Sequence, residues 1–179
     1  MRQGTYSILL GIVLLFGCVE RTSIQRSADD PFLSMPGHLA YNVRVQFTDS
    51  NRIKAVLQGR EGRIDEASNT TVVTGSVVVD FYNEAGTVPR ARLTADSVVV
   101  NDRTKDMTAF GKVIVVSKTR DLTLTTSSLM WVNSSERVRT EAAVHIETGG
   151  ETIDGIGMES NQDLSQYRLY QVRGVRRKS

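Results

Sequence analysis

The sequence has little of the residues from which most catalytic and metal centres are built. Its 179 residues include one cysteine, Cys18, and two histidines, His38 and His145. A single cysteine excludes a disulfide within the chain and a cysteine-rich zinc cluster. The histidines stand 107 positions apart, without the spacing of a metal-ligand pair. We therefore predict no catalytic residues, no metal site and no cofactor, and we expect that the protein is not an enzyme.

The sequence also lacks an excess of charge of either sign. Twenty-two Lys and Arg residues oppose twenty Asp and Glu residues, which leaves a formal charge of +2. Sequence-independent binding of nucleic acid requires a concentrated positive field, so we expect no nucleic-acid partner. Seventeen of the basic residues are arginine. Arginine suits carboxylate or phosphate recognition, although solvated strand faces explain these residues as well.

The residues that are abundant favour strands. Valine contributes 22 residues and threonine 17, and both are β-branched. Hydrophobic residues make up 40% of the chain, which is enough for the core of one domain. The composition excludes a helical bundle and predicts one all-β domain.

The amino-terminal segment has the architecture of a signal peptide. Arg2 precedes an apolar run at residues 7–17, and Cys18 follows this run directly. Eleven residues are too few to cross a membrane as a helix, which needs about 20. Residues 15–18 (Leu-Phe-Gly-Cys) resemble the lipobox of bacterial lipoproteins, although Phe16 departs from its usual small residue.

This resemblance implies that residues 1–17 are removed and that Cys18 is acylated, so that a lipid anchors the protein to a membrane. A plain signal peptide and a short uncleaved anchor are the alternatives. Residues 18–37 show no sustained apolar period and contain Pro31 and Pro36, so they are expected to form a flexible linker.

After His38 the sequence alternates between apolar and polar residues, as strands do. Nine runs have this pattern: 43–47, 52–57, 71–82, 90–100, 107–116, 122–132, 138–147, 152–159 and 167–175. The short connections between them contain Asn, Asp, Ser and Gly, which favour tight turns. Connections this short require antiparallel pairing. Five carboxylates fall in predicted turns, where solvation is the expected state: Asp65, Glu66, Asp102, Asp106 and Glu136.

The runs also repeat one another. Residues 73–79 align with 109–115 and then with 140–146, at offsets of 36 and 31 residues. Each repeat therefore corresponds to one hairpin-like unit stacked on the next. Small residues recur at one position of the repeat, Gly75, Gly111 and Ala142. They favour a β-bulge; the alternative is a slot in which an acyl chain lies against the sheet.

Several features together resemble the LptC family, the periplasmic, membrane-anchored components of lipopolysaccharide export. These are the amino-terminal anchor, Asp49-Ser50 after the first strand, Leu-Thr-Ala-Asp at 93–96, Gly-Lys-Val at 111–113 and the ending at 163–167. The resemblance covers residues 38–175 and implies an antiparallel β-jelly-roll, or twisted open β-taco. Residues 176–179 follow this domain and are expected to form a basic tail. Known members carry an uncleaved transmembrane helix, whereas this chain has a lipoprotein-like signal.

The resemblance further implies how the protein works. Its apolar groove would shelter the acyl chains of lipopolysaccharide, received from the periplasmic domains of an ABC transporter and passed to an LptA-like bridge protein. The protein would lie at the periplasmic face of the inner membrane. Alternation places the candidate groove-lining residues on one face: Val77, Val79, Phe81, Val113, Val115, Val144 and Ile146. The last strand, with Tyr167, Leu169 and Val172, is the candidate partner edge.

Two other functions are consistent with the same residues. An envelope lipoprotein that acts as a scaffold would use its sheet edges for contacts and keep a filled apolar core. A glycan-active enzyme would need paired carboxylates on one face, and the alternation predicts no such pair.

Overall fold

The computed structural model describes residues 38–177, and these form nine β-strands and no helix. The strands are β1 (His38–Asp49), β2 (Arg52–Asp65), β3 (Thr70–Tyr82), β4 (Pro89–Asn101), β5 (Met107–Ser117), β6 (Leu122–Val132), β7 (Arg137–Thr148), β8 (Glu151–Asn161) and β9 (Tyr167–Arg177). Within these residues no helix is present that could cross a membrane. The predictions for Cys18 and for residues 1–37 lie outside the described residues.

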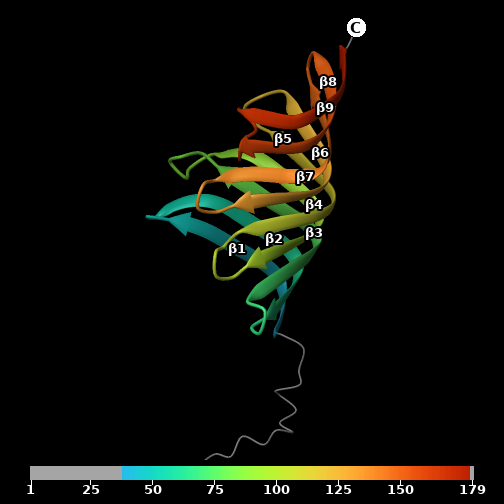
Figure 1. Cartoon of the computed structure of the whole chain (residues 1–179). Helices are drawn as coiled ribbons and strands as arrows, with labels where there is room; N and C mark the ends of the chain where they lie inside the picture. The colour runs from blue at the N-terminus through green and yellow to red at the C-terminus, as the bar shows by residue number, and fades with distance from the viewer. Residues whose placement is uncertain (1–37, 178–179) are drawn as a thin grey trace, which may run out of the picture. The chain divides into compact units, whose positions relative to one another are not determined.

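All nine strands belong to one antiparallel sheet, and their order in the sheet is their order in the chain (Figure 1). Each strand pairs with the next through a short turn, as the spacing of the turn residues predicts. The all-β, antiparallel β-jelly-roll prediction is confirmed. Only β1 and β9 have one unpaired side, so they are the two edges of the sheet.

Bulges lie at the middle of successive strand pairs. In six of the eight ladders the register shifts at mid-strand. Gly75 and Ser76 have positive φ angles of 78° and 55°, and Gly111 and Lys112 have 73° and 46°. A glycine accepts this conformation without the clash of a Cβ atom. The prediction of a β-bulge at the small residues is therefore confirmed. We call this line of bulges the crease.

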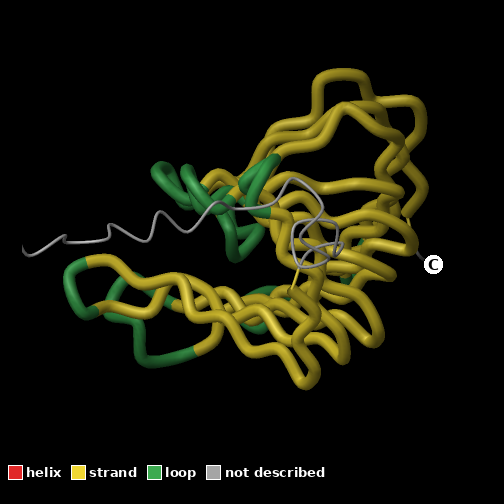
Figure 2. The backbone as a smooth tube through the Cα atoms, turned by 90° about the horizontal axis from the view of Figure 1, so that it is seen from below, coloured by secondary structure: helices red, strands yellow, loops and turns green. Residues whose placement is uncertain are grey.

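At the crease the sheet bends back on itself, so that each long strand contributes to two facing layers (Figure 2). The first layer contains residues 43–58, 77–95, 113–126, 143–156 and 171–177, and the second contains 38–42, 61–74, 97–110, 129–140 and 158–170. Side chains of the two layers meet in one apolar core. Opposite the crease the turns of the two layers approach each other, and we call this side the mouth.

The strands differ from the predicted runs mainly at their ends. β1 begins at His38 and β2 extends to Asp65, although polar residues such as Arg60 and Arg63 interrupt the apolar alternation there. β9 continues to Arg177, so Arg176 and Arg177 are paired with β8 and do not belong to a separate tail. Backbone pairing with a neighbouring strand extends these elements beyond the side-chain pattern.

Candidate functional site: an apolar interior with a polar mouth

The seven residues predicted to line a groove all lie in the first layer and point between the layers. They are Val77, Val79, Phe81, Val113, Val115, Val144 and Ile146, and their exposed fractions lie between 0% and 3%. The period-two pattern thus identified one wall of the interior. In this structure the wall is covered by other side chains, and its contact with lipid stays a prediction.

The opposite wall comes from the second layer and was not among the candidate residues. It is formed by buried side chains that include Val98, Met107, Leu129, Val138 and Met158. These residues also alternate along their strands. In β4, β6 and β8 the bulge changes which alternate residues turn inward, as from Leu124 to Leu129 in β6, whereas in β3, β5 and β7 the same alternation continues across the bulge. Continuing the alternation past the bulge finds Met107 and Val138, whereas Val98, Leu129 and Met158 can be found only when the length of the bulge is known.

The single tryptophan lies beneath the mouth. The ring of Trp131 is 5.5 Å from that of Phe47, edge to face, and 5.9 Å from that of Phe81. Phe47 and Phe81 belong to the first layer and Trp131 to the second, so the aromatic rings join the two layers. The indole Nε1 donates a hydrogen bond of 3.0 Å to Oε1 of Gln162. Trp131 therefore connects the apolar interior to the polar groups above it.

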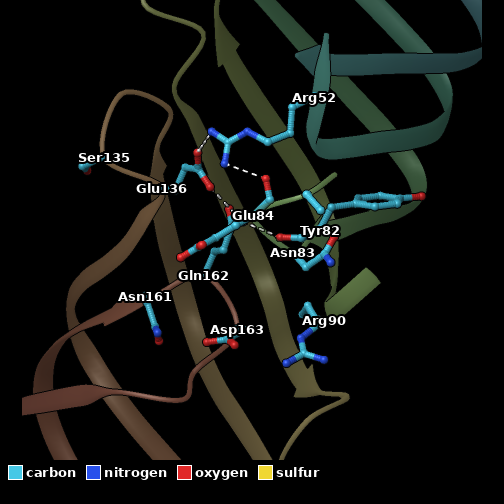
Figure 3. Close-up of a pocket in the computed structure, with 11 residues that line it drawn as sticks. Arg52, Tyr82, Asn83, Glu84, Arg90, Ser135, Glu136, Asn161, Gln162 and Asp163 are labelled. Atoms are coloured by element: carbon cyan, nitrogen blue, oxygen red, sulfur yellow. Dashed lines mark hydrogen bonds and ion pairs between the residues drawn. The ribbon is translucent and has the colours of Figure 1, made fainter. Parts of the chain in front are cut away.

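Above these rings, polar side chains tie the layers together across the mouth (Figure 3). Arg52 of β2 donates to the carboxylate of Glu136 at 2.9 Å and to the carbonyl of Glu84 at 2.9 Å. Lys54 is only 7% exposed; its Nζ donates to the carbonyl of Asn133 at 2.9 Å and lies 3.6 Å from Glu136. Glu136 was expected to be solvated in its turn, but Arg52 and Lys54 half-bury it.

Two further ties involve the turn between β8 and β9. Nε2 of Gln162 donates to the carbonyl of Tyr82 at 2.8 Å and to Glu136 at 3.2 Å. The hydroxyl of Ser117 donates to the carbonyl of Asp163 at 2.8 Å. We call the set Arg52, Lys54, Ser117, Glu136 and Gln162 the clasp. Across residues 38–177, no buried side-chain nitrogen or oxygen lacks a hydrogen-bond partner, and this includes the buried polar atoms of the clasp.

The clasp was missed by sequence reasoning because its members are far apart in the chain. Arg52 and Glu136 are 84 positions apart, and Gln162 and Tyr82 are 80. No short motif marks such pairs. A polar depression of about 700 Å³ lies over the clasp, lined by two arginines and three carboxylates, Glu84, Glu136 and Asp163. This mixed charge is suited to hydrogen bonding and gives no concentrated field of one sign.

The outer face of the sheet carries ion pairs within the first layer. Arg92 donates two hydrogen bonds to Asp80, at 2.9 and 2.8 Å, and Lys118 lies 3.5 Å from the same carboxylate. The hydrogen bonds from Arg92 lower the pKa of Asp80, against the effect of burial, and the charges of Arg92 and Lys118 lower it further. Hydrogen bonds to Asp154, and secondly to Glu147, raise the pKa of His145.

The candidate partner edge is an edge of the sheet, as predicted. Tyr167 and Leu169 of β9 pack partly against the core, whereas Val172 is 57% exposed. Contact of this edge with another protein stays a prediction. The part of the chain that the structure describes holds no cluster of three or more metal-ligating side chains.

One antiparallel sheet folded over an apolar interior, with a polar mouth and two edge strands, places the described residues in the class of β-jelly-roll proteins. A family model described as "Lipopolysaccharide-assembly, LptC-related" matches residues 6–177, and the chain belongs to this LptC family. The expectation that it is not an enzyme agrees with that description.

The fold also resembles a solved structure, the crystal structure of LptH from Pseudomonas aeruginosa, described as the LptA homologous periplasmic component of the conserved lipopolysaccharide transport device. The two chains are 15% identical, the match covers 65% of this chain and 82% of that chain, and the TM-score is 0.49. No curated protein matches the chain in sequence.

Proposed function

We propose that the protein is a membrane-anchored periplasmic component of the lipopolysaccharide export bridge, and that its interior shelters the acyl chains of the lipid in transit. The observation that carries this proposal is the interior itself, whose two apolar walls are joined across the mouth by polar ties. Membership of the lipopolysaccharide-assembly family supports it.

Binding requires the two layers to separate, because the interior walls are closed against each other. Separation at the mouth breaks the clasp but leaves every strand ladder paired, since the ladders run through the crease. Each broken hydrogen bond costs about 0.5 to 1.5 kcal/mol net. Each methylene of an acyl chain that leaves water contributes about 0.8 kcal/mol. One chain of ten methylenes therefore outweighs several ties of the clasp.

The two free edges suit the neighbours that a bridge needs. An edge strand offers unpaired backbone donors and acceptors, to which another sheet can add a strand. We assign β1 to the periplasmic domains of an ABC transporter and β9, with Tyr167, Leu169 and Val172, to an LptA-like bridge protein. This order follows the family resemblance.

The anchor belongs to the same proposal. We infer that Cys18 is acylated and holds the protein at the periplasmic face of the inner membrane, with residues 18–37 as a tether. Its support is the lipobox-like sequence at residues 15–18.

Photo-crosslinking in living cells tests the proposal. A photoreactive residue replaces Val113, which is 0% exposed and points into the interior, or its neighbour Ile114, which is 38% exposed on the outer face. We expect lipopolysaccharide adducts at position 113 and none at 114. Equal capture at both positions, or capture at neither in a folded protein, contradicts the conduit.

A second candidate function is an envelope scaffold with a filled core. The near-complete burial of the seven first-layer residues favours it. Val113→Trp separates the two functions. A filled core is destabilised by this overpacking, typically by about 1 to 3 kcal/mol. A groove that opens accepts the larger ring between the layers and loses lipid binding instead. Two measurements are made on this variant. The first is the midpoint of denaturant unfolding, and the second is the yield of lipid adducts formed by a photoreactive residue placed at position 115.

A further inference from the structure

A second depression lies on the outer side of the sheet, at the crease, over β1 to β4. Its volume is about 600 Å³, and it is outside the interior and far along the strands from the mouth. Three arginines from three strands line it, Arg44, Arg60 and Arg92, together with the amides of Asn42 and Gln58 and the hydroxyl of Ser76. Every one of these side chains offers hydrogen-bond donors. We call this depression the crease hollow.

The charge of the crease hollow differs from that of the depression at the mouth. The mouth depression has three carboxylates among its lining residues, and the crease hollow has none. Arg92 is held by Asp80 through Nε and Nη2. Arg44 and Arg60 have no ion pair with any described residue. Two uncompensated guanidinium groups therefore face one hollow.

The bulge of β3 shapes this site. Pairing between β2 and β3 is interrupted between Gln58 and Glu61, opposite Gly75 and Ser76. A Cβ atom added to Gly75 would lie 2.7 Å from Cβ and 3.2 Å from Nε of Arg60, so the arginine stem crosses directly over the glycine. Arg44 pairs in register with Gln58, two residues before Arg60. The backbone thus sets both arginines beside the same gap in the ladder.

We propose that the crease hollow binds a phosphate group, with Arg44 and Arg60 as its direct ligands and with Arg92, which is paired with Asp80, in its lining. A guanidinium group presents two parallel N–H donors, which match two phosphate oxygens. Arg44 and Arg60 have no carboxylate partner among the described residues, and this favours an anion over a sugar or a cation. This site goes beyond the lipid conduit, because it lies on the opposite face of the sheet. Its phosphate comes either from the headgroup of an anionic phospholipid or from a free phosphate.

Calorimetric titration of the full chain in neutral detergent tests the site. The probes are inorganic phosphate and a water-soluble short-chain phosphatidylglycerol. The variant Arg44→Gln/Arg60→Gln removes both direct ligands, and Arg168→Gln/Arg173→Gln removes two arginines of β9 as a matched control. We expect binding about tenfold weaker or more in the first variant and unchanged binding in the control. Arg60→Lys keeps the positive charge but lacks the two parallel N–H donors of the guanidinium group, so its affinity for the probes should be intermediate.

The two probes identify the source of the phosphate. Binding of both probes indicates a site for phosphate itself, and binding of phosphatidylglycerol alone indicates a lipid headgroup. Either result supports the site if the Arg44→Gln/Arg60→Gln variant loses the binding seen in the wild type. Absence of binding to both probes, or equal binding by wild type and that variant, overturns the proposal. Circular dichroism of each variant confirms that the sheet is intact. Lipid capture at Val113 is unaffected by this variant, so failure here leaves the conduit untouched.

Discussion

The crease and the mouth join the same two layers by opposite means. At the crease the connection is the backbone itself, bent at bulges that recur in successive ladders. At the mouth it consists of side chains such as Arg52 and Glu136, which are 84 positions apart. The crease cannot part without breaking strands, whereas the mouth parts by breaking a few hydrogen bonds. The difference indicates a sheet that is hinged on one side and closed reversibly on the other.

Removing the aromatic side chain beneath the mouth should have the largest effect on stability. Trp131 is 2% exposed and contacts rings of the opposite layer. Trp131→Ala leaves a cavity and leaves Gln162 without its indole donor, so we expect a loss of about 3 to 5 kcal/mol. Denaturant unfolding measures this loss of unfolding free energy. A loss below about 1 kcal/mol would show that the mouth is not packed on this ring.

The crease should be sensitive to any Cβ atom at its glycines. Gly111 has a φ of 73°, and an added Cβ would clash with the carboxylate of Asp96. Gly111→Ala should cost about 1 to 2 kcal/mol from the left-handed backbone alone. The neighbouring variant Lys112→Gly is the control, because Lys112 has a φ of 46° and should gain stability when its Cβ is removed. Unfolding midpoints that shift in the same direction for both variants would contradict the bulge.

Breaking the clasp should change lipid uptake more clearly than stability. Glu136→Gln removes the charge shared by Arg52 and Lys54, and we expect a loss of about 1 to 2 kcal/mol because the group is only partly buried. Fluorescent lipopolysaccharide should enter the variant faster than wild type. Glu159→Gln breaks the Arg137–Glu159 pair, which lies within one layer, and is the matched control. Equal acceleration in both variants would refute a role specific to the mouth.

The smallest effect is expected away from both regions, on the outer face of β7. Nδ1 of His145 forms a hydrogen bond of 2.7 Å with the carboxylate of Asp154. This hydrogen bond, and secondly the one with Glu147, raise the pKa of His145. A raised pKa adds stability that is fully present below the unfolded value of about 6.5 and is lost as the pH rises through the folded value. The stability difference between wild type and His145→Gln should therefore shrink from pH 6 to pH 9. A difference that grows with pH would contradict the assignment.

Sequence patterns predicted the crease far better than the mouth. The alternation of Val77, Val79 and Phe81 is local, and so is the glycine repeat, because strand pleating and bulges act on neighbouring residues. The clasp depends on how far the sheet bends, which brings Lys54 over Asn133. No local pattern encodes that distance. Glu136 was accordingly read as a solvated turn residue.

For a related reason, only the first-layer wall of the interior was predicted from the sequence. The seven first-layer residues follow one alternation, but the wall formed by Leu129 and Met158 follows another that begins after the bulge. The length of a bulge decides which residues turn inward beyond it. The sequence located the bulges at Gly75 and Gly111, but it did not give the number of residues in each bulge.

The opening of the mouth is the central claim, and a distance measurement across it tests that claim most directly. Spin labels at Glu84 of the first layer and Ser135 of the second, in a Cys18→Ser background, report the separation by pulsed electron resonance. A control pair at Glu84 and Arg120 lies within the first layer. We predict that lipopolysaccharide shifts the first pair to longer distances and leaves the control pair unchanged, whereas its delipidated polysaccharide shifts neither. An unchanged first pair at saturating lipopolysaccharide would contradict the account.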